Sequence, residues 1–116
     1  MRLKPNEEDV VKQIVQGLRV NGIAIFREII PRFGSVTGSD RLEAGHPDLH
    51  GWFKRGPSFA PVPVYIEVKA PGRHKKRPAQ IEFITRAKAD GCIAFFAQGW
   101  DDVVREFHNF GITLPN

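Results

Sequence analysis

The spacing of apolar residues predicts a helix near the start of the chain, followed by a strand. Between residues 6 and 22, apolar side chains recur at helical spacing, at Val10, Val11, Ile14, Val15 and Leu18. Asn6 is placed to cap this helix and Gly22 to end it. Residues 23–30 (IAIFREII) are apolar on both faces except at Arg27 and Glu28, which favours a strand in the interior of a sheet.

The rest of the chain alternates between strands and helices. Strands are predicted over 46–53, 62–70 and 92–98, and helices over 78–91 and 100–111. Residues 31–45 form a long polar loop, 54–61 a turn rich in proline and glycine, and 112–116 a tail or an edge strand. This order, α-β-β-β-α-β-α, predicts an α/β fold in which a mixed sheet of about four strands is flanked by helices. We expect residues 1–116 to form a single domain.

Composition and charge narrow the class of protein. At 41% hydrophobic and 26% charged residues, the chain can bury a core without disulfides, and its one cysteine, Cys92, excludes an internal disulfide. No apolar run reaches membrane-spanning length and no signal peptide is evident, so an intracellular, cytoplasmic protein is expected. The net charge is +4, and basic residues cluster over 73–77. Such a cluster indicates either an anionic partner, nucleic acid first, or a solvated loop.

Two opposite charges stand at the end of an otherwise apolar strand. Glu67 and Lys69 are two positions apart, so their side chains point to the same side of the strand. Asp48 precedes Leu49 in the previous strand and converges with Glu67 if the two strands are neighbours. Two close carboxylates repel each other unless a cation lies between them, and oxygen ligands favour a hard ion such as Mg²⁺. An ordinary ion pair on an exposed strand is the alternative interpretation.

These motifs resemble those of the VRR-NUC domain, a branch of the restriction-endonuclease-like PD-(D/E)xK nucleases. The resemblance is carried by GHPDLHGWF (45–53), by YIEVKAPG (65–72) and by Gln80 early in the following helix. The segments EEDVVKQIV (7–15) and WDDVVREF (100–107), and the strand near Cys92, are also similar, so the resemblance covers nearly the whole chain. It implies a restriction-endonuclease-like core.

The resemblance also implies roles for individual residues. Asp48 and Glu67 would bind Mg²⁺ or Mn²⁺, with the Val68 backbone carbonyl as a third ligand, and Lys69 would be the catalytic lysine. Glu7, which fits the register better than Glu8, would support the metal from the first helix, directly or through water. Gln80 would help to place the lysine, the attacking water or a phosphate.

The function implied is a Mg²⁺-dependent DNA endonuclease that hydrolyses phosphodiester bonds by direct attack of water. Relatives that stand alone are similar to Holliday junction resolvases and act as homodimers on branched DNA, and a phage or prophage origin would suit such a protein. Contacts to the nucleic acid are expected from the basic residues, which are Arg73, His74, Lys75, Lys76, Arg77, Arg32 and Arg41.

Other interpretations stay open. The chain could bind nucleic acid without cutting it, or cut RNA with the same residues. His46, Asp48 and His50 share one strand face, which is compatible with a zinc or iron site that only His74 or His108 could complete with further histidines. Arg27 pairs either with an acid near the metal or within a buried structural ion pair. Four aromatic residues are interpreted as core or interface, with base stacking as the alternative: Trp52, Phe53, Trp100 and Phe107.

Overall fold

One four-stranded sheet and three helices make up the described part of the protein. The computed structural model describes residues 5–28, 45–72 and 75–116. The elements are α1 (Glu7–Val20), β1 (Ala24–Arg27), β2 (Leu49–Phe53), β3 (Val62–Val68), α2 (Pro78–Ala89), β4 (Ile93–Ala97) and α3 (Trp100–Asn109). The predicted α/β fold and the order α-β-β-β-α-β-α are therefore confirmed.

The sheet is mixed, with the strand order β1-β2-β3-β4. β1 pairs antiparallel with β2, β2 pairs antiparallel with β3, and β3 pairs parallel with β4 through the crossover helix α2. β3 is thus an interior strand, as its apolar sequence requires.

Among the described strands, β1 lies at an edge of the sheet, which contradicts the prediction of an interior strand over 23–30. The apolar side chains of this segment are not all covered. Ile23 and Ile25 are buried on the face that carries α1, whereas Phe26 on the other face is 44% exposed. Ile29 and Ile30, which contributed to that prediction, lie outside the described residues.

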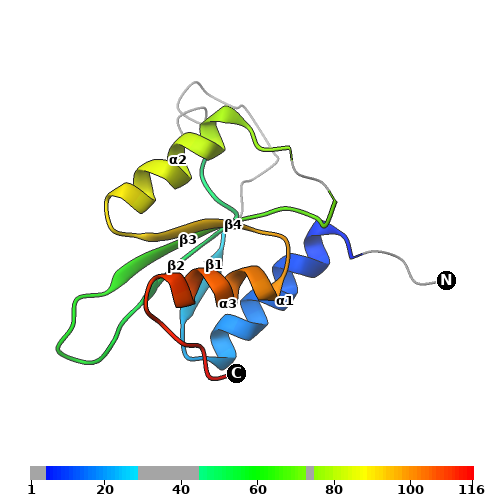
Figure 1. The fold of residues 1–116 in the computed structure, drawn as a ribbon. Helices are drawn as coiled ribbons and strands as arrows, with labels where there is room; N and C mark the ends of the chain where they lie inside the picture. The colour runs from blue at the N-terminus through cyan, green and yellow to red at the C-terminus, as the bar shows by residue number, and fades with distance from the viewer. Residues whose placement is uncertain (1–4, 29–44, 73–74) are drawn as a thin grey trace.

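The helices cover the two faces of the sheet unequally (Figure 1). α1 and α3 lie on one face and enclose the larger core, which includes Ile14, Leu18, Ile66, Val68 and Phe107. α2 lies on the other face and packs on β3 and β4, where Ile84 and Ala87 meet Ala94 in a smaller core. Side chains of β3 alternate between these two cores, as a two-residue strand period dictates.

The ends of α1 follow the sequence signals. The Asn6 side chain accepts a hydrogen bond from the Asp9 backbone N–H at 2.8 Å, and Asp9 Oδ2 accepts one from the Asn6 N–H at 3.1 Å, which completes a capping box. After the helix, Gly22 takes a φ of 76°, a conformation that glycine adopts at little cost. Residues 112–116 form no strand and run as a tail, whose last residue hydrogen-bonds to Asn21.

None of the helices in the described ranges combines the length and the apolar character needed to cross a membrane.

Candidate active site

The two carboxylates singled out in the sequence lie opposite each other on neighbouring strands. β2 pairs with β3 so that Leu49 faces Ile66, which places Asp48 beside Glu67 at the end of the ladder. The Asp48 backbone N–H donates to Glu67 Oε1 at 3.2 Å, and the Val68 N–H donates to Asp48 Oδ2 at 2.9 Å. Each acid therefore accepts a hydrogen bond from the backbone of the other strand, and both strands hold the pair together.

Lys69 and Gln80 complete a four-residue cluster with these acids. Because Glu67 and Lys69 share one side of the chain, both face the first turn of α2, where Gln80 lies. Gln80 Nε2 donates to Glu67 Oε2 and Lys69 Nζ donates to Gln80 Oε1, each at 2.9 Å. Lys69 Nζ also lies 3.6 Å from Glu67 Oε2. We call Asp48, Glu67, Lys69 and Gln80 the carboxylate–lysine cluster.

Gln80 is itself held in place by the start of α2. Its Oε1 accepts a second hydrogen bond, at 3.0 Å, from the backbone N–H of Arg77, the residue that precedes the helix. The amide therefore joins three elements, which are the end of β3, the basic segment before α2 and the helix itself. This arrangement limits the rotamers of both Gln80 and Lys69.

Burial makes this an electrostatically unfavourable place for two negative charges. Glu67 is 4% exposed. Among the described residues, it is the one charged residue that is buried. Burial, together with the neighbouring Asp48 carboxylate, raises the pKa of Glu67 to about 7, and the Lys69 ammonium only partly opposes this rise. A bound cation would relieve the same repulsion.

The donors present suit a hard divalent cation that keeps part of its water. The Asp48 and Glu67 carboxylates would supply oxygen ligands, and Mg²⁺ is typically held by one or two carboxylates together with waters and substrate phosphates. The Val68 backbone carbonyl stays a predicted third ligand. Within the described residues, no three or more His, Cys, Asp or Glu side chains are grouped as a ready-made metal site. Carboxylate oxygens are the ligand type that Mg²⁺ and Mn²⁺ prefer, so the chemistry of Asp48 and Glu67 fits either ion.

Glu7 is not brought into this cluster. It is exposed at the start of α1, and no hydrogen bond or ion pair between described residues joins it to Asp48 or Glu67. Its neighbour Glu8 binds Arg27 instead, with Arg27 Nη1 2.7 Å from Glu8 Oε1 and a second bond between Nη2 and Oε2. The role expected for Glu7 stays a prediction.

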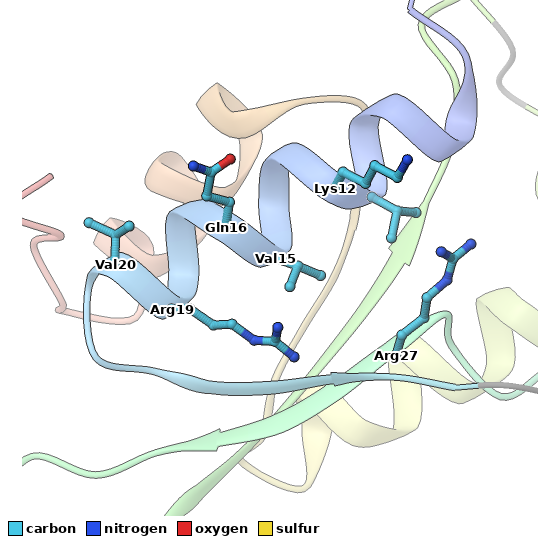
Figure 2. A pocket seen from close by; sticks show the side chains of 7 residues that line it. Lys12, Val15, Gln16, Arg19, Val20 and Arg27 are labelled. Atoms are coloured by element: carbon cyan, nitrogen blue, oxygen red, sulfur yellow. The ribbon is translucent and has the colours of Figure 1, made fainter.

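Arg27 interacts electrostatically both with acids at the start of α1 and with Asp48 of the carboxylate–lysine cluster. Figure 2 shows its side chain extending from β1 toward α1, at one end of a groove of about 440 Å³ between these two elements. The Glu8 carboxylate raises the pKa of Arg27, and the more distant Asp48 and Glu7 charges act in the same direction. The direct partner of Arg27 is therefore Glu8, in an ion pair that is about half exposed rather than buried. The sequence register favoured Glu7 over Glu8 as the functional acid of α1, and no sequence signal pointed to Glu8 as the partner of Arg27.

The described part of the basic cluster lies beside the carboxylate–lysine cluster. Lys75, Lys76 and Arg77 are exposed and lead directly into α2, and Lys76 Nζ lies 4.6 Å from the centre of the Phe96 ring. The other expected nucleic-acid contacts fall outside the described residues, namely Arg73, His74, Arg32 and Arg41.

The histidines flanking Asp48 contact aromatic rings and an acid. The His46 and His50 rings are 6.2 Å apart, and His46 also lies 5.6 Å from the Phe83 ring. His50 Nδ1 lies 3.4 Å from Glu28 Oε2 and has no hydrogen-bond partner in the described structure. His108 is on α3, across the sheet from Asp48, and His74 is outside the described residues, so the structure brings no further histidine to a zinc or iron site here.

Comparison with protein-family models, with curated proteins and with solved structures gave no match to this chain.

Proposed function

We propose that this chain is a Mg²⁺-dependent DNA endonuclease of the VRR-NUC type, which hydrolyses phosphodiester bonds in branched DNA as a homodimer. One observation carries the proposal, which is that Asp48, Glu67, Lys69 and Gln80 meet at the end of two neighbouring strands. The DNA structure preferred and the homodimer rest on the sequence resemblance alone.

The chemistry of the cluster supports hydrolysis of a phosphodiester. A divalent cation bound by the two carboxylates would act as a Lewis acid that stabilises charge developing on the phosphoryl group. Backbone hydrogen bonds hold the Asp48 and Glu67 carboxylates side by side, which supports a shared cation and would lower the reorganisation needed to bind it.

Lys69 is suited to contact the water or the phosphate. A lysine ammonium has three N–H donors, and its described neighbours are Gln80 Oε1 and Glu67 Oε2. A remaining N–H can donate to an attacking water or to a phosphate oxygen. Gln80 keeps the amine at this position and so acts as a positioning residue.

The exposed cations next to the cluster supply a binding surface for the polyanion. Lys75, Lys76 and Arg77 precede α2, on the side where Gln80 contacts the cluster. Contacts between such side chains and phosphates provide most of the affinity for nucleic acid without reading its sequence.

The test is a cleavage assay with matched substrates and variants. Labelled duplex, flap and four-way-junction DNA and a matched RNA are incubated with Mg²⁺, Mn²⁺ or a chelator. We expect metal-dependent cuts in branched DNA, in symmetric pairs if the protein is a homodimer, and loss of cleavage with retained binding in Glu67→Ala. Glu82→Ala, on the exposed face of α2, is the control that should cut normally.

Two results would contradict the proposal. Equal cleavage by wild type and Glu67→Ala would remove the carboxylate–lysine cluster from the reaction. Salt-sensitive binding without metal-dependent cutting of any substrate would instead identify a non-catalytic nucleic-acid-binding module, and cutting of RNA alone would identify an RNA-directed nuclease.

A further inference from the structure

A row of aromatic rings runs from the carboxylate–lysine cluster to the edge of the sheet. Trp52 and Phe26 have ring centres 5.6 Å apart, Phe26 and His50 are 6.0 Å apart, and His50 and His46 are 6.2 Å apart. Strand pairing explains the row, because Phe26 on β1 lies directly opposite His50 on β2, and Trp52 is two positions further along β2. We call Trp52, Phe26, His50 and His46 the aromatic strip.

The described helices leave the outer part of the aromatic strip uncovered. α2 lies on this face of the sheet but packs on β3 and β4, not on β1 and β2. Trp52 is 48% exposed and Phe26 is 44% exposed. Large half-exposed rings side by side on a sheet indicate a binding surface for a ligand or a macromolecular partner.

The aromatic strip is continuous with the carboxylate–lysine cluster. Asp48 and His50 are two positions apart on one strand, so their side chains share a face and lie about 7 Å apart along it. A nucleic-acid strand with a phosphate at Asp48 and Glu67 would therefore carry its neighbouring nucleotides across the rings.

We propose that the aromatic strip stacks unpaired bases of the substrate, so that the preferred substrate has a single-stranded segment next to the bond that is cut. This inference rests on the proposed function and adds a substrate class to it. Stacking on aromatic rings tolerates any base sequence, because every base has a π face. Lys54, exposed two positions after Trp52, is placed to meet the backbone of the same strand.

The size of the strip favours bases over a second copy of the chain. The partly exposed rings offer on the order of 300 Å² of surface, whereas a stable dimer buries roughly 800 Å² on each partner. The histidines add polar edges, and the exposed cation Lys54 follows Trp52 by two positions. A few stacked bases with flanking phosphates fit these features.

The test measures binding without cleavage. The protein is titrated into fluorescently labelled oligo(dT) or labelled blunt duplex in the presence of a chelator. Affinities are read from the anisotropy of the label, and quenching of Trp fluorescence is recorded for the wild type. We expect quenching by oligo(dT), and roughly tenfold weaker oligo(dT) binding in Trp52→Leu or Phe26→Leu. Duplex affinity should change less than twofold. Trp52→Phe, which keeps a ring, should retain most of the oligo(dT) affinity.

The matched control is Phe59→Leu. Phe59 is 57% exposed, but it lies in the turn between β2 and β3 and makes none of the ring contacts that define the strip. Its loss should therefore leave oligo(dT) binding unchanged. Circular dichroism confirms that each variant is folded.

The outcomes separate this inference from the proposed function. Roughly tenfold weaker oligo(dT) binding by Trp52→Leu and by Phe26→Leu, in a protein that cuts no substrate, supports the strip and refutes the nuclease. Normal oligo(dT) binding by folded Trp52→Leu and Phe26→Leu overturns the strip even if the protein cuts DNA. Conversion of a dimer to a monomer by Trp52→Leu also overturns it, since the strip would then be a surface between copies of the chain.

Discussion

Glu67 is a carboxylate in a position that disfavours its charge. It is 4% exposed, lies between apolar residues of β3 and faces a second carboxylate, Asp48. Hydrogen bonds from Gln80 and from the Asp48 backbone reduce the cost of burial without removing it. A cation bound next to Glu67 would offset the electrostatic cost of its negative charge, as expected at the proposed metal-dependent site.

The raised pKa of Glu67 predicts how the stability of the fold depends on pH. Because the pKa of Glu67 is raised to about 7 from an ordinary value of 4.5, the folded protein binds an extra proton between these values. The free energy of unfolding should therefore fall as pH rises from about 5 to 8, by roughly 3 kcal/mol. Urea denaturation at several pH values measures this slope.

Variants and metal provide the controls for the pH prediction. Glu67→Gln should flatten the slope, whereas Glu82→Gln on the exposed face of α2 should keep it. Added Mg²⁺ should raise the stability of the wild type at pH 8 and have little effect at pH 5, where Glu67 is protonated. An equal slope in wild type and Glu67→Gln would show that another group titrates.

At the scale of elements, the position of the first turn of α2 depends on close packing against Gly45, in the segment before β2. Gly45, in the segment that leads to Asp48, packs so tightly on α2 that a Cβ built on it would lie 2.4 Å from the Ala79 backbone oxygen. Ala79 precedes Gln80, which hydrogen-bonds to both Lys69 and Glu67. The absence of a side chain at Gly45 therefore lets the segment before β2 and the start of α2 meet at the cluster.

Gly45→Ala should consequently affect both stability and cleavage. The backbone of α2 must shift to admit the methyl group, at a cost of about 1–3 kcal/mol, and Gln80 must move with it. We expect a lower urea midpoint and a lower kcat on a cleaved DNA. In Gly56→Ala, the new Cβ would meet only Phe59, at 3.6 Å, so this control should show neither effect. Unchanged kcat in a destabilised Gly45→Ala protein would separate helix position from catalysis.

At the scale of the whole molecule, the net charge of +4 is unevenly distributed. Lys75, Lys76 and Arg77 lie together before α2, whereas Lys88 near the other end of α2 is 3.7 Å from Glu106. The molecule therefore presents free positive charge beside the carboxylate–lysine cluster, and partly neutralised charge elsewhere on the same helix.

This asymmetry predicts which lysine controls salt dependence. Binding of DNA should weaken with added salt, and Lys76→Ala should reduce the slope of log affinity against log salt by about 1. Lys88→Ala should leave that slope unchanged. Fluorescence anisotropy in a chelator, over a series of salt concentrations, gives both slopes, and equal slopes in the two variants would remove the segment before α2 from the binding surface.

By itself, the sequence determined the order of helices and strands and the pairing of Glu67 with Lys69 on one face, because these depend on short-range spacing. It also pointed to Asp48 and Gln80 through their motifs. The tertiary structure alone decided the rest. It set the edge position of β1, the pairing of Arg27 with Glu8, and the exposure of Trp52 beside Phe26. Each of these depends on which segments far apart in the sequence pack together. A local pattern of apolar and polar residues does not determine such long-range contacts.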